Sequence, residues 1–152
     1  MKNILNFSVI LLCLAGLLGF TSCSKDDSVS TNSPADVQNT VKAGNWHITS
    51  FVDSGKDETQ HFTGYSFNFL DNNVLTATNG SNSFTGTWSI EDSNSNDDSI
   101  NDLHFNIQFN LTNDFEDLNE DWQIVSRTST RIELIHVSGG NGGTDYLTFE
   151  KG

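Results

Sequence analysis

Cysteine, proline and basic residues are scarce in this sequence of 152 residues. It has two Cys, one Pro and seven Lys or Arg against 20 Asp or Glu, which gives a formal net charge of −13. Neutralising phosphates requires clustered Lys and Arg, so this composition excludes nucleic acid as a partner. It equally excludes docking on anionic lipid through a basic helix face. The single Pro excludes collagen-like and proline-rich chains.

Aromatic residues are plentiful although hydrophobic residues as a whole are few. Hydrophobic residues make up 35% of the chain, yet aromatic residues make up 11% and include 11 Phe. A disordered chain lacks such aromatics because it has no core in which to bury them. The length suits one domain. We therefore expect a single folded domain, preceded by the segments described next.

Residues 1–22 have the organisation of a secretory signal peptide. Lys2 supplies a positive start, residues 4–20 are almost wholly apolar, and Thr21 and Ser22 are small. The apolar run is close to the minimum of about 17 residues for a spanning helix, so an uncleaved membrane anchor is the alternative. Cleavage after Ser22 removes one basic residue and no acid, so the mature chain is still more acidic.

The end of this segment, Leu18-Gly19-Phe20-Thr21-Ser22-Cys23, resembles the lipobox of bacterial lipoproteins. In that family the Cys carries lipid, such as palmitate, and the signal peptide is cut just before it. The resemblance implies that Cys23 is the lipidation site and anchors the protein to a membrane. Cys13 would leave with the signal peptide, so the mature chain could form no internal disulfide and would keep no free thiol.

Three charged residues follow the lipobox within four positions of Cys23. Lys25, Asp26 and Asp27 resemble the export signal of surface-exposed lipoproteins in the Bacteroidota. This resemblance implies an outer-membrane lipoprotein exposed on the cell surface. A charged, solvated linker that faces the periplasm is the alternative. Residues 23–33 are mostly small and polar, and they predict a flexible tether between the lipid and the domain at residues 34–152.

A short helix is predicted at residues 34–43. Ser33 is a good N-cap, Pro34 suits the first helical position, and Gly44 can end the helix. Val37 and Val41 are four residues apart and share one face. A helix this short is marginal alone, so we expect this face to pack on the rest of the domain.

From Trp46 onward apolar and polar residues alternate, which predicts an all-β domain. Turn residues such as Asp71-Asn72-Asn73 and the glycine-rich run 139–143 separate the alternating segments. Eight sequential antiparallel strands favour an up-and-down β-barrel, with a sandwich as the alternative. Phe115 and Leu118, in residues 112–120, are predicted to lie on a helical turn against one barrel end. The predicted strands cover residues 46–53, 62–70, 74–79, 83–90, 102–111, 121–127, 130–137 and 144–150.

The segment Gly44-Asn45-Trp46, on the first strand after a short helix, resembles the lipocalin signature. The run from Gly44 to Lys151 is similar to the small lipocalin-like domains of Bacteroidota lipoproteins. In lipocalins the Trp packs at the closed barrel end, the helix covers that end, and an Arg after the last strand stacks on the Trp. Here only Lys151 follows the last strand, while Arg127 and Arg131 flank the strand before it. The resemblance therefore leaves the stacking partner open.

Lipocalins bind small apolar molecules inside the barrel, which leads to two functional hypotheses. The first is a non-enzymatic protein that binds a small apolar or amphiphilic ligand. The second is a structural or interaction module with a solid core, which acts through its acidic outer surface on a glycan or an envelope protein. An eight-stranded barrel is wide enough either for one small ligand or for side chains that fill it. In the first hypothesis the pocket is lined by Tyr65, Phe67, Trp88 and Phe105.

Sequence motifs for catalysis or metal binding are lacking. There is no Gly-x-Ser-x-Gly nucleophile elbow, and no two His have the spacing of a helical metal site. We therefore expect no enzyme activity, no cofactor and no metal. Each of the four His, namely His47, His61, His104 and His136, is expected to be solvated or hydrogen-bonded, and a meeting of His47 with His136 across a barrel seam is the alternative for these two.

Residues 91–101 contain part of a calcium-loop pattern. Asp92, Asn94 and Asn96 place oxygens at alternating positions, as in an EF-hand loop. Asp97 occupies the position that requires Gly, and Leu103 the position of the bidentate Glu. A solvated acidic loop is therefore the prediction, and weak calcium binding the alternative.

Overall fold

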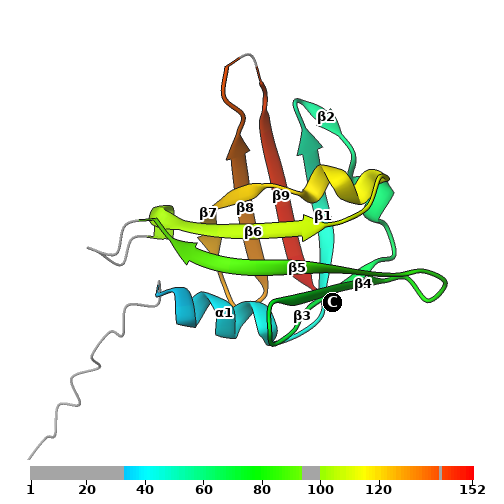
Figure 1. Cartoon of the computed structure of the whole chain (residues 1–152), viewed down its shortest axis with the longest axis horizontal. Helices are drawn as coiled ribbons and strands as arrows, with labels where there is room; N and C mark the ends of the chain where they lie inside the picture. Colours follow the sequence, from blue (N-terminus) through cyan, green and yellow to red (C-terminus); the bar gives the residue numbers. More distant parts are fainter. Residues whose placement is uncertain (1–32, 94–99, 141) are drawn as a thin grey trace, which may run out of the picture.

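The computed structural model describes residues 33–93, 100–140 and 142–152 (Figure 1). The described residues form one α-helix, three short 3-10 helices and nine strands. The helices are α1 (Pro34–Lys42), η1 (Thr59–Phe62), η2 (Ile100–Asp102) and η3 (Asp114–Leu118). The strands are β1 (Trp46–Asp53), β2 (Lys56–Asp57), β3 (Ser66–Phe69), β4 (Val74–Thr78), β5 (Ser83–Asp92), β6 (Leu103–Phe109), β7 (Asp121–Arg127), β8 (Arg131–Val137) and β9 (Thr144–Lys151).

Eight of the strands close into an antiparallel up-and-down barrel, which confirms the predicted fold class. Strand order follows the sequence from β3 to β9, and β1 pairs with both β3 and β9 to close the ring. The β1–β9 pairing is long, whereas β1 meets β3 only at Trp46 opposite Phe67. Strand β2 extends β1 as a hairpin beyond the ring. The seam between β1 and β3 is therefore the weakest part of the barrel wall.

Two features between β1 and β3 differ from the prediction. The β1–β2 hairpin was not predicted, although Ser54 and Gly55 form its turn with positive φ angles of 48° and 86°. The strand predicted at residues 62–70 begins only at Ser66. Phe62 belongs to η1, and its side chain is buried although it is out of phase with Tyr65 and Phe67. The 3-10 helix turns Phe62 inward, which a period of two could not do.

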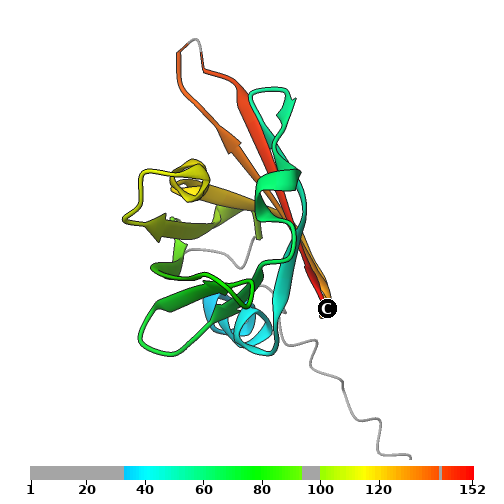
Figure 2. The same ribbon diagram turned by 90° about the vertical axis from the view of Figure 1, so that its right-hand side faces the viewer.

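Short helices cover the two ends of the barrel (Figures 1 and 2). At one end, α1 buries Val37 and Val41 completely, and the Trp46 indole Nε1 donates a 2.7 Å hydrogen bond to the Val41 carbonyl. At the other end, η3 buries Phe115 and Leu118, as predicted. The Leu118 carbonyl accepts a hydrogen bond from the Trp122 indole. Ser33 caps α1 through its side chain, also as predicted.

Aromatic rings fill the space between these two ends. Phe69 packs on Trp88, Phe105 and Phe149 with centroid separations of 5.2–5.6 Å. Phe149 in turn packs on Phe67. The chain of contacts continues to Phe115, whose ring lies 4.8–6.0 Å from five others, namely Phe62, Tyr65, Phe67, Phe84 and Phe109. The core thus contains a continuous aromatic network from Trp88 on β5 to Phe115 on η3.

Candidate functional site

The helix-covered end places Gly44, Trp46 and Lys151 in contact. The Lys151 ammonium lies 4.8 Å from the centroid of the Trp46 ring, within the range of a cation–π interaction. Gly44 has a φ of +148°, and a Cβ there would lie 3.3 Å from the Lys151 Cε. Arg127 instead donates a hydrogen bond to the Thr40 hydroxyl on α1. Lys151 is therefore the cation stacked on Trp46, the partner that the resemblance left open.

The four residues predicted to line a ligand pocket are all buried in the aromatic network. Tyr65 packs on Phe84 and Phe115, and its hydroxyl accepts a hydrogen bond from Asn82. Phe67 packs on Phe115 and Phe149. Tyr65 and Phe67 therefore belong to the part of the network next to η3.

Trp88 and Phe105 belong to a different part of this network. They pack on each other and both pack on Phe69. The Trp88 indole also donates a 3.0 Å hydrogen bond to the Leu70 carbonyl. The four predicted residues thus form two groups whose ring faces contact neighbouring rings. This packing favours the hypothesis of a solid core over that of an internal ligand pocket.

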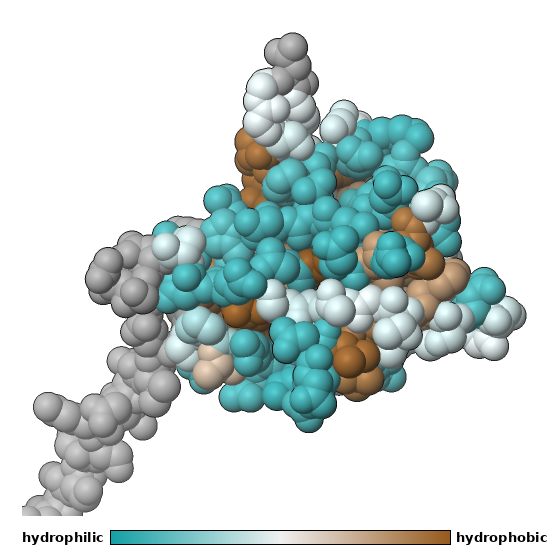
Figure 3. Space-filling model, viewed as in Figure 1, coloured by the Kyte–Doolittle hydropathy of each residue, from teal (hydrophilic) through white to brown (hydrophobic). Residues whose placement is uncertain are grey.

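A polar groove lies on the outer face of β5 and β6, and we call it the outer groove. Its volume is about 560 Å³, and its lining includes Thr87, Ser89, Glu91, Asn106 and Gln108. The Asn106 amide donates to Ser89, whose hydroxyl donates to Glu91, each at 3.0 Å. Figure 3 shows this face as mostly hydrophilic. None of the lining residues is basic, so the outer groove offers amides, hydroxyls and carboxylates.

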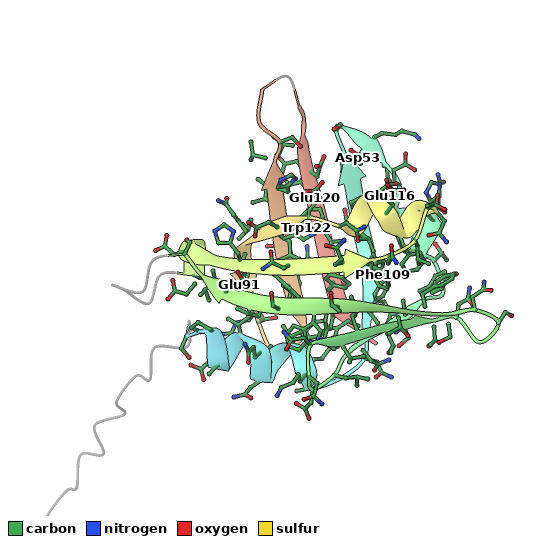
Figure 4. All side chains as sticks on the ribbon, in the orientation of Figure 1. Asp53, Glu91, Phe109, Glu116, Glu120 and Trp122 are labelled. Carbon is green, nitrogen blue, oxygen red and sulfur yellow. The ribbon has the colours of Figure 1, made fainter. Side chains whose placement is uncertain are left out.

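Six carboxylates gather at the η3 end of the barrel, and we call them the acidic rim. Figure 4 labels two of its members, Asp53 and Glu120, near Glu116 at this end. Four of the six are buried or half-buried, namely Asp53, Glu58, Glu120 and Asp145, whereas Asp114 and Asp117 are exposed. The members of the acidic rim are Asp53, Glu58, Asp114, Asp117, Glu120 and Asp145.

Two carboxyl groups of the acidic rim, those of Asp117 and Glu120, have raised pKa values. Partial burial, followed by the charges of Asp53 and Asp114, raises the pKa of Asp117. Partial burial also raises the pKa of Glu120, and Asp145 adds to this effect while His136 opposes it. Both shifts mean that these two carboxyl groups hold a negative charge less readily than fully solvated ones do.

His136 lies between two carboxylates of the acidic rim. Its Nδ1 is 3.3 Å from Glu120 Oε2 and 3.5 Å from Asp145 Oδ2. Asp145 is only 7% exposed, and its Oδ1 accepts a 2.8 Å hydrogen bond from the Ser54 backbone N–H. The His136 ring also packs edge-on against Trp122, with 6.1 Å between centroids. The three side chains come from the segment before β7, from β8 and from β9.

His61 has a similar position on the opposite side of the acidic rim. Its Nδ1 lies 3.2 Å from Glu58 Oε2 and 3.3 Å from Asp114 Oδ1. Glu58 also forms an ion pair with Lys56 on β2. The cation of Lys56 therefore balances part of the charge here, whereas no Lys or Arg is paired with Glu120 or Asp145 among the ion pairs of the described residues.

His47 and His136 do not meet, so the alternative pairing across a barrel seam is wrong. His47 is opposite Glu150 on β9, whereas His136 is opposite Asp145, so the two His lie towards different ends of the barrel. His47 instead contacts the Tyr65 carbonyl through Nδ1 at 2.8 Å. His104 lies 2.6 Å from Asp121 on the outer surface. The antiparallel register, which the sequence alone did not specify, accounts for this separation.

Several predicted sites lie outside the described residues. These are the lipidation site Cys23, the export signal Lys25, Asp26 and Asp27, and most of the calcium-like loop at residues 91–101. They stay predictions. Within the described residues, the helices are too short or too polar to span a bilayer.

The fold defines the chain as a small, closed, eight-stranded β-barrel protein with one covering α-helix. No family model matches the chain, and no curated protein does. Among solved structures, it is similar to a DUF4847 family protein from Bacteroides vulgatus ATCC 8482, with 15% sequence identity and a TM-score of 0.50. The match covers 76% of this chain and 97% of the other. At this identity the likeness supports the barrel fold alone.

Proposed function

We propose that the protein is a lipid-anchored envelope protein whose solid barrel binds a hydroxyl-rich partner, a glycan, in the outer groove. The observation that carries this proposal is the contrast between the two faces of the barrel wall. The inner face is occupied by ring-to-ring contacts such as that of Phe69 with Phe105. The outer face of β5 and β6 offers a groove of about 560 Å³ lined by hydrogen-bonding groups.

The lining of the outer groove suits a neutral glycan. Sugar hydroxyls both donate and accept hydrogen bonds, and the amides of Asn106 and Gln108 can do the same. Glu91 can accept from two hydroxyls at once. Because the lining has three carboxylates, at Glu91, Glu120 and Asp121, and no basic residue, an acidic sugar would be repelled. Neutral or amino sugars therefore fit this site best.

The membrane anchor belongs to the same proposal. Lipidation of Cys23 would attach the chain to the outer membrane, and Lys25, Asp26 and Asp27 would direct it to the cell surface. Ten residues separate Cys23 from Pro34, a tether of up to about 35 Å when extended. Because α1 covers one barrel end, the acidic rim would lie at the end far from the start of the domain (Figure 2). The outer groove would remain accessible from solvent.

Backbone NMR titration with neutral oligosaccharides tests the groove. The chain from Ser24 onward should show saturable shifts confined to β5, β6 and the segment before β7. Asn106→Ala combined with Gln108→Ala should abolish them, because it removes two amides from the lining. Asn68→Ala, which removes an outward amide on β3, is the matched control and should keep them.

Two outcomes would contradict this function. One is the absence of shifts with any neutral oligosaccharide. The other is saturable binding of a fatty acid or lipid that shifts residues of the aromatic network, such as Phe67 and Phe105. The second outcome would support the small-ligand hypothesis instead, which stays a prediction of the sequence.

A further inference from the structure

We propose that Glu120, His136 and Asp145 form a binding site for a divalent transition-metal ion of the zinc class at the acidic rim. This inference does not rest on the proposed glycan function, because it shares only Glu120 with the outer groove and is measured with the metal alone. The three residues offer one imidazole nitrogen and two carboxylate oxygens, all within 4.8 Å of one another.

The spacing of the donor atoms matches a tetrahedral site. Zinc binds His nitrogen and carboxylate oxygen at about 2.0–2.2 Å, so neighbouring ligand atoms of a tetrahedron are about 3.3–3.5 Å apart. The two separations from His136 Nδ1, 3.3 Å to Glu120 and 3.5 Å to Asp145, equal this edge. The third separation, between the two carboxylate oxygens, is within 4.8 Å, so an ion between the three groups would draw the two carboxylates towards each other.

The His136 nitrogen supplies a second, independent indication of a ligand. Its Nδ1 is a buried atom, yet it makes no hydrogen bond of acceptable geometry although two carboxylates are near it. A buried nitrogen without a partner is costly, and a metal ion would satisfy it through its lone pair. A proton shared with the carboxylates is the alternative, so the experiment must separate metal from proton.

Neighbouring groups hold the Asp145 side chain in position, as is typical of metal ligands. The Asp145 side chain is nine-tenths buried and is oriented by the Ser54 backbone N–H, which leaves its Oδ2 facing His136. Outer contacts of this kind fix the direction of a metal ligand. Asp53 lies close enough to influence the Glu120 carboxyl, so the local potential also attracts a cation.

The donor set selects the metal. One imidazole with two carboxylates suits Zn²⁺ or Co²⁺, whereas Ca²⁺ and Mg²⁺ prefer oxygen ligands throughout. Residues 34–152 contain no Cys, so no thiolate competes for the ion. With three protein ligands, a fourth position would be left for water.

Calorimetric titration with ZnCl₂, on the untagged chain from Ser24 onward after treatment with chelator, tests the site. We expect one equivalent of Zn²⁺ to bind near neutral pH, and Co²⁺ to give the visible absorption of a tetrahedral complex. His136→Ala should weaken binding by at least ~100-fold, because it removes a direct ligand. Asp145→Asn should weaken it too while keeping an oxygen that accepts from Ser54.

Two control variants make the result specific. His104→Ala removes a His that is paired with Asp121 on the outer surface, and it should leave Zn²⁺ affinity unchanged. His61→Ala removes the His next to Glu58 and Asp114, and it should also leave affinity unchanged. Circular dichroism of each variant establishes that the barrel is folded.

The proposal is overturned if the wild-type chain binds no stoichiometric Zn²⁺, which would identify the cluster as a proton-bridged ion pair. It is equally overturned if binding survives His136→Ala, or if His61→Ala alone abolishes it. Tighter binding of Ca²⁺ than of Zn²⁺ would also contradict it, because the imidazole would then not be a ligand.

Discussion

Trp46 is the residue at which helix, barrel and chain end meet. Its indole nitrogen donates to Val41 on α1, its ring lies under the Lys151 ammonium, and Gly44 leaves room for the Lys151 side chain. The Lys151 side chain therefore covers the Trp46 ring, with its aliphatic stem near Gly44 and its ammonium near solvent. The charge and the stem make separable contributions to stability.

Replacing Lys151 with Met separates these contributions. Lys151→Met keeps an unbranched stem but removes the cation, so it should lower the free energy of unfolding by about 0.5–1 kcal/mol. Lys151→Arg restores a cation and should recover most of this loss. Urea denaturation followed by Trp fluorescence measures both. Equal stability of the Met variant and the wild type would show that the cation contributes nothing.

Asp117 is a residue whose charge opposes folding. Burial and neighbouring carboxylates raise its pKa, so the folded protein binds a proton more readily than the unfolded chain does. The resulting destabilisation is fully present above the raised pKa and disappears as pH falls below the usual Asp value of about 4. Asp117→Asn should therefore raise the melting temperature at pH 7, and the gain should shrink as pH falls towards 4.

The control for Asp117 is Asp71→Asn. Asp71 pairs with Lys42 at the other end of the barrel, so neutralising it should give no gain at pH 7. Melting curves recorded from pH 4 to 8 provide the comparison. A gain for Asp117→Asn that grows as pH falls would contradict the assigned direction of the shift.

At the scale of elements, η3 closes one end of the barrel by burying Phe115 and Leu118. It is only five residues long, yet it places Phe115 against five other rings and Leu118 under the Trp122 indole. Asn113 fixes its start by accepting from the Phe115 backbone N–H. A helix this short gains its stability from such packing rather than from its own hydrogen bonds.

Truncating the Phe115 side chain of η3 should strongly destabilise the protein. Phe115→Ala should lower the free energy of unfolding by about 3–5 kcal/mol, because it removes buried surface and leaves a cavity. Leu70→Ala, at a hydrophobic residue that is 46% exposed, should change it by less than about 0.5 kcal/mol. Urea denaturation of both variants gives the comparison. A loss below about 1 kcal/mol for Phe115→Ala would mean that the barrel end is not sealed by this ring.

The elements were largely predictable from the sequence because inward and outward residues alternate so regularly. Strand β6 alternates buried and more exposed positions from Leu103 to Phe109, as its sequence indicates. The exception, Phe62, is out of phase with its neighbours, since a 3-10 helix and not a strand turns it inward. Turns were predictable where Asn or Gly gave the signal, as at Asn72 and Asn73. The Ser54-Gly55 turn carried the same kind of signal and was missed.

The acidic rim could not be predicted from the sequence, for a physical reason. Its members come from η3 and from strand ends that meet only when the barrel closes. The His136–Asp145 pair is a partial exception, because the antiparallel pairing of the neighbouring strands β8 and β9 places these two residues opposite each other. The approach of Glu120 to His136 depends on the path of the chain from η3 into β7, which no local sequence pattern indicates.

At the scale of the whole molecule, the barrel separates a packed interior from a polar exterior. The two ends also differ: α1 seals one end, and the acidic rim surrounds the other. With a net charge of −13, the exterior favours cations and neutral polar partners over anionic ones. We propose that the interior is solid and that recognition takes place on the outside.

The most direct test is native mass spectrometry of the protein purified from the cells that produce it, after proteolytic release from the lipid anchor proposed at Cys23. We expect the mass of the released chain, alone or with one metal ion, and no bound lipid or other apolar molecule. A reproducible, stoichiometric lipid mass would contradict this expectation, because the interior would then hold a ligand where Phe67, Phe69 and Phe105 pack on other rings.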